Sequence, residues 1–258
     1  MNLKAIYEPK GRAAEYADLA VNLYQGCTHG CAYCYAPTVL YMDRATFHSQ
    51  CIERPGILDK LRSDAKRLVN STEWQEYGWK YVLFCFSCDP YQPGAHATRA
   101  ALSIMREFDI PFTVLTKGTM AWRDFDLYGR RDRFGVTLTF DNDADSAEWE
   151  PGAAKPAERM AMLRDAHLHR IKTWVSLEPV IDPAQTLRII DATHEHVDHY
   201  AVGKLNYHPH AATIDWPQFR AYVLERLNQY PVGYQIKKDL WEARRPHSAE
   251  DEAAGGEG

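Results

Sequence analysis

Short apolar runs alternate with amphipathic stretches along almost the whole of this 258-residue chain, and this alternation constrains the fold more than any other feature. The runs are rich in β-branched and aromatic residues and have the length of buried strands. We expect strands at Ala20–Tyr24, Tyr81–Phe86, Phe112–Thr116, Phe134–Phe140, Lys172–Leu177 and Tyr200–Lys204, with a seventh candidate at Val232–Ile236. Helices are expected between them at Gly56–Val69, Thr98–Phe108, Pro156–His169, Pro183–Thr193 and Trp216–Gln229.

Regular alternation of strand and helix predicts parallel strands joined by right-handed crossovers. Six such units are too few for a closed barrel of eight strands. The predicted fold class is therefore α/β, an open, partial (β/α)6 barrel of the TIM type. We expect an N-terminal arm at 1–19, the barrel at 20–245, and a disordered acidic tail at 246–258 that is too polar to bury apolar surface.

Three of the six cysteines, Cys27, Cys31 and Cys34, lie in one short loop directly after the first expected strand. Their C-x3-C-x2-C spacing suits a [4Fe–4S] cluster, in which three thiolates leave one iron open to an exchangeable ligand. An open iron permits chemistry, whereas a fully ligated cluster mainly carries electrons. A structural zinc site is the alternative, because His29 within the loop offers a further ligand.

Composition favours an intracellular enzyme. No apolar targeting segment opens the chain, and no later apolar run is long enough to span a bilayer. Cysteines gathered in one loop do not suggest a secreted disulfide framework, and an oxygen-sensitive cluster needs a reducing compartment. We therefore expect a cytoplasmic protein without membrane association. The net charge of −5 gives no general attraction to a polyanion, so nucleic-acid contact would need a local basic strip.

Several short motifs occur in an order that resembles a known family. The cysteine loop resembles that of the radical S-adenosylmethionine (SAM) superfamily. The loop ending Cys-x-Tyr-Cys-Tyr resembles the spore photoproduct lyase-like group within it, as do Asp89-Pro90-Tyr91-Gln92-Pro93, Thr116-Lys117 and Trp149-Glu150-Pro151-Gly152. The resemblance covers about 22 to 207. It implies a [4Fe–4S] cluster and SAM as cofactors, and cleavage of SAM to a 5′-deoxyadenosyl radical that abstracts hydrogen.

The resemblance also implies roles for individual residues, which follow the expected strands at the end where parallel barrels carry their active sites. Cys27, Cys31 and Cys34 would bind iron. Lys117 would pair with the SAM carboxylate, and Ser87 would contact the SAM amine. The other expected cofactor contacts are Tyr33, Asp89, Thr137, Thr139 and Glu178. Two roles stay open for Asp89, which either contacts a ribose hydroxyl or fixes the turn before Pro90.

Cys85 and Tyr35 have the expected catalytic roles. In spore photoproduct lyases, a cysteine two residues before the SAM-contacting serine donates a hydrogen atom to the product radical. A tyrosine just after the cluster loop assists it, and Cys85 and Tyr35 occupy these two places. The alternative is that Cys85 is a small core residue, since unpaired cysteine is among the most buried residue types.

The expected function is hydrogen abstraction from a thymine lesion or modified nucleobase by a radical SAM enzyme. Its expected partners are SAM, an external electron donor of the flavodoxin or ferredoxin type, and a nucleic acid or nucleotide substrate. The acidic composition and the lack of an evident extra DNA-binding element keep two alternatives open. These are radical modification of a small molecule or peptide, and a non-catalytic Fe–S or zinc-binding module.

Overall fold

The computed structural model describes residues 3–72, 74 and 81–244, and an eight-stranded sheet forms its centre. In spatial order the strands are β1 (Ile6–Tyr7), β2 (Leu19–Val21), β5 (Val82–Phe84), β6 (Phe112–Thr116), β7 (Arg133–Thr137), β8 (Lys172–Val180), β9 (His199–Lys204) and β10 (Gly233–Ile236). β1 is antiparallel to β2, and every other neighbouring pair is parallel. Outside this sheet, β3 (Tyr24–Gln25) and β4 (Ile52–Glu53) form an antiparallel pair.

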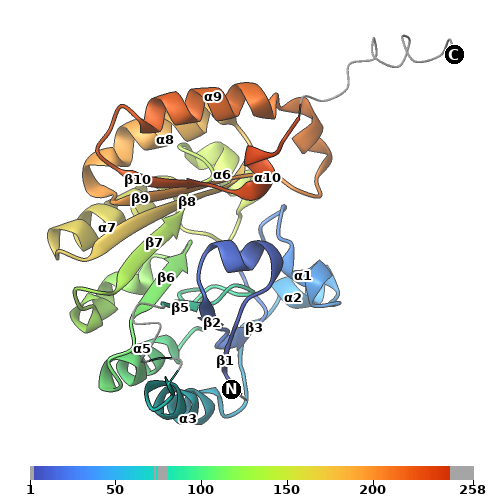
Figure 1. The fold of residues 1–258 in the computed structure, drawn as a ribbon. Coiled ribbons are helices and arrows are strands. Elements are labelled where there is room, and N and C mark those ends of the chain that lie inside the picture. The colour runs from blue at the N-terminus through green and yellow to red at the C-terminus, as the bar shows by residue number, and fades with distance from the viewer. Residues whose placement is uncertain (1–2, 73, 75–80, 245–258) are drawn as a thin grey trace, which may run out of the picture.

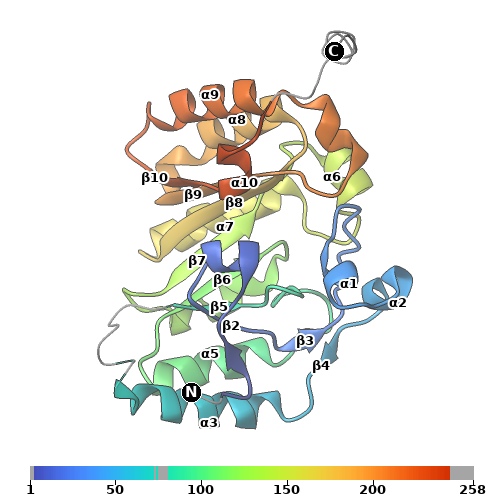
Figure 2. The same cartoon turned by 45° about the vertical axis from the view of Figure 1, so that its right-hand side comes forward.

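The sheet is a partial barrel, because β1 and β10 are its two edges and do not pair with each other. Figures 1 and 2 show β8, β9 and β10 on one side of the opening and β1 and β2 on the other. The predicted α/β fold class and its parallel strands are therefore confirmed, and the seventh strand candidate is β10. The two-residue β1 was not predicted, since so short a strand shows no alternation of apolar and polar residues.

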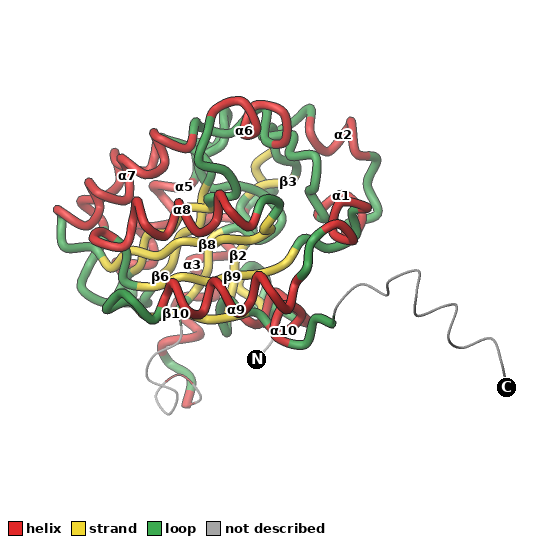
Figure 3. The backbone as a smooth tube through the Cα atoms, turned by 90° about the horizontal axis from the view of Figure 1, so that it is seen from above, coloured by secondary structure: helices red, strands yellow, loops and turns green. Residues whose placement is uncertain are grey.

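Helices flank the sheet, and the longer ones lie where periodicity predicted them (Figure 3). They are α1 (Ala36–Val39), α2 (Arg44–His48), α3 (Ile57–Val69), α5 (Thr98–Glu107), α6 (Asp143–Trp149), α7 (Pro156–Leu168), α8 (Pro183–Thr193), α9 (Trp216–Leu227) and α10 (Lys238–Trp241). Short 3-10 segments are η1 (Gly11–Glu15), η2 (Met120–Leu127), η3 (His194–His196) and η4 (Pro209–Thr213). In the described part of the chain, no helix is both long and apolar enough to cross a membrane.

Two hydrophobic clusters divide the core. The larger lies between the sheet and the helices, and the smaller fills the barrel interior with Ala20, Leu83, Trp174 and Ala201. Leu115 packs against the smaller cluster. Because alternate residues of a strand share a face, the residues two positions further along also face the interior. This rule places Lys117 beyond Leu115, and Ser176 and Glu178 beyond Trp174, at the carboxyl ends of β6 and β8.

The N-terminal arm packs on both edges of the sheet. Asp64 of α3 accepts hydrogen bonds from the backbone N–H groups of Lys4, Ala5 and Ile6, which fixes β1 beside β2. η1 then lies across the open side of the barrel (Figure 2). Its Glu15 accepts from the Lys238 N–H at 2.9 Å, beyond the end of β10. The acidic tail expected at 246–258 lies outside the described residues.

Candidate functional site

The cysteine loop runs from the end of β3 to the start of α1, and two glycines shape it. Gly26 has φ +86 and Gly30 has φ +65, in the left-handed region that residues with a Cβ rarely adopt. A Cβ on Gly26 would also overlap the carbonyl oxygen of Gln50. The path of the loop thus depends on glycine at Gly26. The loop carries three free thiols, those of Cys27, Cys31 and Cys34.

Arg44 of α2 holds one side of this loop. Its guanidinium donates to the carbonyl oxygens of Cys31, Ala32 and Cys34 at 2.6, 2.5 and 2.9 Å. A guanidinium can serve three acceptors at once because its five donors lie in one rigid plane. Sequence reasoning missed Arg44, since a basic residue on a short helix gives no signal of such a contact.

Gln92, from the segment that follows β5, connects this segment to the cysteine loop. Its side-chain oxygen accepts from the Thr28 N–H at 2.8 Å, and its side-chain nitrogen donates to the Gly26 carbonyl at 3.1 Å. Both ends of the amide are therefore used, and the side chain is buried. Gln92 belongs to the motif Asp89-Pro90-Tyr91-Gln92-Pro93, but its hydrogen bonds to the cysteine loop were not predicted from the sequence.

The segment Trp149–Gly152 holds the loop from a second direction. The Ala32 N–H donates to the Trp149 carbonyl at 2.8 Å, and the Gly152 N–H donates to the His29 carbonyl at 2.9 Å. A Cβ on Gly152 would overlap the Thr28 carbonyl oxygen, so the two backbones approach as closely as glycine allows. The loop is thus fixed by backbone contacts that leave its thiol side chains available.

The Asp89 carboxylate contacts the cysteine loop, the turn that follows Asp89 itself, and the end of β6. Its Oδ1 accepts from the Tyr91 N–H at 2.8 Å and from the Thr116 hydroxyl at 2.6 Å. Its Oδ2 accepts from the Lys117 N–H at 2.7 Å and lies 3.5 Å from Nδ1 of His29. Both carboxylate oxygens are engaged within the protein, as the turn-fixing alternative requires. Asp89 therefore positions the backbone of Lys117.

The binding of a cluster by the three loop thiols stays a prediction. In the described residues, no three His, Cys, Asp or Glu side chains converge closely enough to hold a single metal ion. A [4Fe–4S] cluster asks for a different arrangement, since each thiolate binds a separate iron. Burial raises the pKa of Cys31 to about 11, against the opposing effect of the Lys117 ammonium. The metal-free thiol therefore keeps its proton, which iron binding displaces.

Two polar groups near the loop have no hydrogen-bond or ion-pair partner among the described residues. The Ser87 hydroxyl is buried and makes no hydrogen bond. The Lys117 ammonium forms no ion pair or hydrogen bond with the described residues, and lies 5.5 Å from the centroid of the Tyr33 ring. Burial alone would lower the pKa of Lys117, but nearby Cys31 and Glu150 outweigh it and raise that pKa. A buried hydroxyl and a cation without partners fit a zwitterionic ligand such as the amino-acid end of SAM.

Glu150 and Arg159 form a buried ion pair behind the loop, with 2.5 Å between Oε2 and Nη2. Both side chains are 1% exposed or less. The second Glu150 oxygen accepts from the Tyr33 hydroxyl, which holds that ring beside the loop. Burial opposes ionisation of Glu150, but Arg159 and Lys117 outweigh it and keep the pKa of the carboxyl below its usual value. Glu150 was expected only as part of a motif, and its ion pair with Arg159 was not predicted.

Thr137 is the last residue of β7, and Thr139 lies two residues beyond it, on the side of this ion pair. Thr139 is buried, and its hydroxyl lies 3.3 Å from that of Tyr33. Thr137 is also buried, and its carbonyl accepts from Arg159 at 2.7 Å. Tyr33, Thr137 and Thr139 therefore surround one network, as expected for neighbouring strand ends.

Cys85 lies away from the barrel interior. The strand β5 ends at Phe84, and Cys85 has φ +70. This backbone turn interrupts the alternation of side chains between the barrel interior and the helix side of the sheet. Phe86 packs in the interior cluster, while Cys85 is 5% exposed in the core between sheet and helices. This placement agrees with the core alternative. The role of Cys85 as a hydrogen donor stays a prediction.

Tyr35 and Glu178 lie at the opening of the barrel. Tyr35 is 51% exposed, and its hydroxyl donates to the Phe86 carbonyl at 3.0 Å. Glu178 faces the interior and accepts from the hydroxyl of Tyr16, a residue of the N-terminal arm. Tyr16 was not predicted as a site residue, because 162 residues separate it from Glu178.

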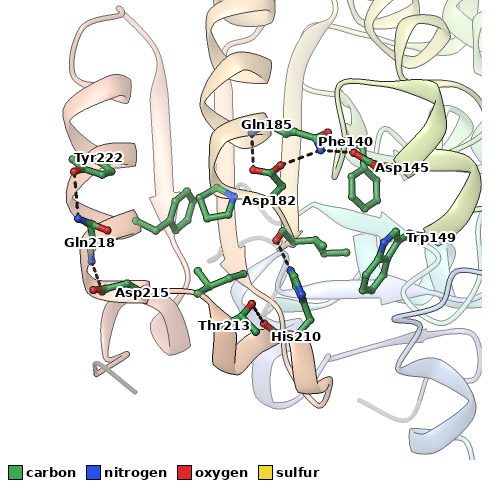
Figure 4. Close-up of a pocket in the computed structure, with 14 residues that line it drawn as sticks. Phe140, Asp145, Trp149, Asp182, Gln185, His210, Thr213, Asp215, Gln218 and Tyr222 are labelled. Carbon is green, nitrogen blue, oxygen red and sulfur yellow. Dashed lines mark hydrogen bonds between the residues drawn. The ribbon is translucent and has the colours of Figure 1, made fainter. Parts of the chain in front are cut away.

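A hollow of about 490 Å³ lies beside the site, between α6 and the first turns of α8 and α9 (Figure 4). Trp149, whose carbonyl binds the cysteine loop, forms part of its wall. Its acidic lining residues are Asp145, Asp182 and Asp215, and none of the described residues around it is a lysine or arginine. Gln185 donates to Asp145 at 2.6 Å, as Figure 4 shows.

The family description that matches this chain is that of the radical SAM superfamily, over residues 21–197. The chain belongs to the radical SAM superfamily. The superfamily uses a [4Fe–4S] cluster and SAM, and these are therefore the cofactors of this enzyme. The matched region contains the cysteine loop, Ser87, Lys117 and Glu150. The resemblance of the cysteine loop to that of the radical SAM superfamily is thereby confirmed.

Relatives among curated proteins come from a virus, a bacterium and an archaeon. An uncharacterized protein of Acidianus two-tailed virus is 26% identical over 171 residues, which are 64% of this chain and 56% of that protein. An uncharacterized protein of Mycobacterium tuberculosis is 27% identical over 173 residues, 62% of this chain and 49% of that protein. This chain thus matches about half the length of these two relatives. One of Methanocaldococcus jannaschii is 23% identical, covering 85% of this chain and 79% of that protein.

Solved structures share the fold at low sequence identity. A spore photoproduct lyase variant with bound AdoMet and dinucleoside spore photoproduct aligns with a TM-score of 0.67 at 14% identity, covering 86% of this chain and 76% of that one. SuiB of Streptococcus suis bound to S-adenosylmethionine aligns with a TM-score of 0.64 at 13% identity, covering 86% and 51%. Both alignments support the partial barrel and leave the substrate open.

Proposed function

We propose that Cys27, Cys31 and Cys34 ligate the cluster, and that the enzyme abstracts hydrogen from a substrate held at the carboxyl ends of the strands. Once bound, a reduced cluster and SAM supply a 5′-deoxyadenosyl radical for this abstraction. One observation carries the proposal. The buried Ser87 hydroxyl makes no hydrogen bond, and the Lys117 ammonium contacts the Tyr33 ring but has no hydrogen-bond or ion-pair partner among the described residues, next to a braced loop of three free thiols. Such groups are costly to bury unless a ligand completes their contacts.

The proposed contacts divide along the SAM molecule. Lys117 pairs with the carboxylate and Ser87 with the amine, while Tyr33, held by Glu150, lies beside the bound amino acid. Asp89 acts through the backbone of Lys117, since its own oxygens are already engaged. The contacts proposed for the adenosyl end are Thr137, Thr139 and Glu178, which follow on β7 and β8.

The proposed substrate class is a nucleobase, either a thymine lesion or a modified base. Support comes from the fold shared with a lyase that holds a dinucleoside spore photoproduct, and from the half-exposed ring of Tyr35 at the barrel opening. An aromatic ring in this position offers a stacking surface for a base. Cys85 is the proposed hydrogen donor of this reaction, and Tyr35 is proposed to assist it.

Radical modification of a small molecule or peptide is the second candidate, and the acidic hollow favours it. The lining of Asp145, Asp182 and Asp215 suits a cationic group better than a phosphodiester. Turnover of an amine or basic peptide, with no response to thymine-containing oligonucleotides, would decide for this candidate.

An external electron donor of the flavodoxin or ferredoxin type is the proposed partner, and a reducing cytoplasm the proposed location. A hollow of about 370 Å³ borders His29 of the cysteine loop, on the side lined by Met120 and Arg123. Met120 is exposed, which gives a carrier protein an apolar contact close to the loop. The barrel at 20–245 is the proposed catalytic unit, with 1–19 as its arm.

Metal analysis tests the ligand assignment. Anaerobic reconstitution with iron and sulfide should load about four irons per chain and give visible absorbance, because the three loop thiolates bind one [4Fe–4S] cluster. Stoichiometric zinc in anaerobically purified protein, with no iron uptake, would contradict the assignment and favour the non-catalytic module.

A further inference from the structure

A group of partly or fully buried polar side chains gathers around Glu178, and the proposed contact of Glu178 with the cofactor does not explain its other members. Its members are Tyr16 from the N-terminal arm, Ser176 and Glu178 from β8, and Lys237 directly after β10. Lys237 is only 1% exposed. Burying charged groups is unfavourable unless they are paired and hydrogen-bonded. Groups with strongly perturbed pKa values gather at functional sites.

The contacts in this group converge on one carboxylate oxygen. The Tyr16 hydroxyl donates to Oε2 of Glu178 and lies 2.8 Å from the Ser176 hydroxyl. The Lys237 ammonium lies 3.8 Å from the same Oε2 and 3.5 Å from the centroid of the Tyr16 ring. The ammonium also donates to the Arg12 carbonyl at 3.2 Å, which ties it to the arm.

The other oxygen of Glu178 stays available. Oε1 makes no hydrogen bond or ion pair with any described residue, and 19% of the Glu178 side chain is exposed. Gly203 of β9 leaves room for this carboxylate, because a Cβ there would lie 2.5 Å from Cδ of Glu178. Glu178 therefore presents one oriented acceptor toward the barrel interior, suited to a hydroxyl or amine donor.

We propose that the N-terminal arm completes the cofactor site, with Tyr16 and Lys237 as positioning residues that hold Glu178 as an acceptor for a hydroxyl of the adenosyl group. This inference rests on the proposed function, in which Glu178 contacts SAM. It assigns the arm a direct part in cofactor binding, beyond closing the open side of the barrel. Without Tyr16 the carboxylate loses the donor that fixes its rotamer.

Charged groups around Glu178 determine how this acceptor responds to pH. Burial raises the pKa of Glu178, the Lys237 ammonium and the Tyr16 hydroxyl lower it, and Asp239 and Glu15 raise it further. Tyr35 also lies close enough to feel the charge of Glu178. The ionised carboxylate accepts a hydroxyl more strongly than the neutral acid does, so cofactor affinity falls as the pH falls through this pKa. Removing the Tyr16 donor or the Lys237 cation raises the pKa, so the loss begins at a higher pH.

Equilibrium binding of SAM to the anaerobically reconstituted enzyme tests the proposal. Tyr16→Phe should weaken SAM about tenfold at neutral pH, with iron content unchanged, because it removes one hydrogen bond to a carboxylate. Tyr234→Phe is the matched control, since it also loses one tyrosine hydrogen bond, 2.9 Å long, to Asn228 at the other end of β10. The second variant is Lys237→Met, with Lys238→Met at the exposed neighbouring position as its control.

Two readouts separate positioning from a merely structural role. Tyr16→Phe should add no further loss in a Glu178→Gln background, because the phenol acts through the carboxylate. The acid-side midpoint of SAM affinity should move to higher pH in Tyr16→Phe and Lys237→Met, and this transition should be absent in Glu178→Gln. 5′-Deoxyadenosine, which lacks the amino-acid end, should show the same losses, while Lys117→Ala leaves its affinity unchanged.

The outcomes are distinguishable. If the parent enzyme binds no SAM, the proposed function itself fails. If the parent binds SAM while Tyr16→Phe and Lys237→Met bind SAM and 5′-deoxyadenosine as the parent does, the positioning role is overturned and the proposed function stands. Additive losses in the Tyr16→Phe/Glu178→Gln pair would also overturn it.

Discussion

The two walls of the barrel interior are built in opposite ways. The cluster wall, formed by the cysteine loop and the ends of β5 and β6, is fixed through its backbone and leaves the Ser87 hydroxyl without a described partner. The arm wall, formed by Tyr16, Glu178 and Lys237, is already paired through its side chains. The contrast indicates that the cluster wall depends on ligands for its polar contacts, whereas the arm wall is organised before a ligand binds.

The largest effect expected on the cluster wall comes from removing a loop thiol. Cys31→Ala should abolish both the cluster absorbance and SAM cleavage, because two thiolates cannot replace three around the cube. Cys51→Ala is the matched control, since Cys51 is a free cysteine outside the loop. Full iron loading of Cys31→Ala, measured by metal analysis, would show that the loop does not hold the cluster.

The next largest effect should come from the ion pair behind the cluster wall. Arg159→Met leaves Glu150 buried without its cation, and this should lower the free energy of unfolding by about 3–5 kcal/mol. Chemical denaturation of the metal-free protein measures it. The exposed pair Arg62 and Glu107 offers the control, because Arg62→Ala should change stability by less than about 1 kcal/mol. Equal losses in both variants would remove the special role of the buried pair.

The affinity for SAM should depend on Lys117 and Ser87, the two groups of the cluster wall without a hydrogen-bond or ion-pair partner. Lys117→Ala should weaken SAM by about 1.5–3 kcal/mol, and Ser87→Ala by less, with the cluster retained, because each loses one contact to the amino-acid end. Lys155→Ala tests the specificity, since Lys155 is exposed and paired with Asp143. Parent-like SAM binding by both variants would place the amino-acid end elsewhere.

Cys85 should give the smallest effect. If it is a core residue, Cys85→Ala loses about 1 kcal/mol of stability and leaves SAM cleavage and products unchanged. Incubation with dinucleoside spore photoproduct provides the product assay. Adducts from solvent or dithionite in the variant alone would show that the thiol quenches a product radical despite its place in the core.

The fold was largely predictable because it depends on local periodicity. The apolar spacing in Gly56–Val69 predicted α3, and Pro183 marked the first residue of α8, whose Asp182 cap accepts from the Ala184 N–H at 2.7 Å. The strand expected at Ala20–Tyr24 ends at Val21, and Tyr24 instead begins β3. The pairing of β3 with β4 was missed, because two residues in each strand carry no periodic signal.

The site was predictable where chemistry follows a strand and unpredictable where it joins distant segments. Lys117 lies two residues beyond Leu115 on the interior face, and the strand pattern alone places it there. Cys85 follows the same rule in the sequence, but its positive φ turns it to the other side. The contact of Tyr16 with Glu178 spans 162 residues and depends on how the arm crosses the open barrel.

The central claim is that the cysteine loop and the two unpartnered groups beside it form a site for reductive SAM cleavage. Chromatographic measurement of 5′-deoxyadenosine after anaerobic reconstitution with iron, sulfide, dithionite and SAM tests it most directly. The account predicts formation that depends on dithionite and on all three loop cysteines, and that falls in Lys117→Ala at limiting SAM. A fully loaded cluster that yields no 5′-deoxyadenosine, or yields it equally from Cys31→Ala, would contradict the account.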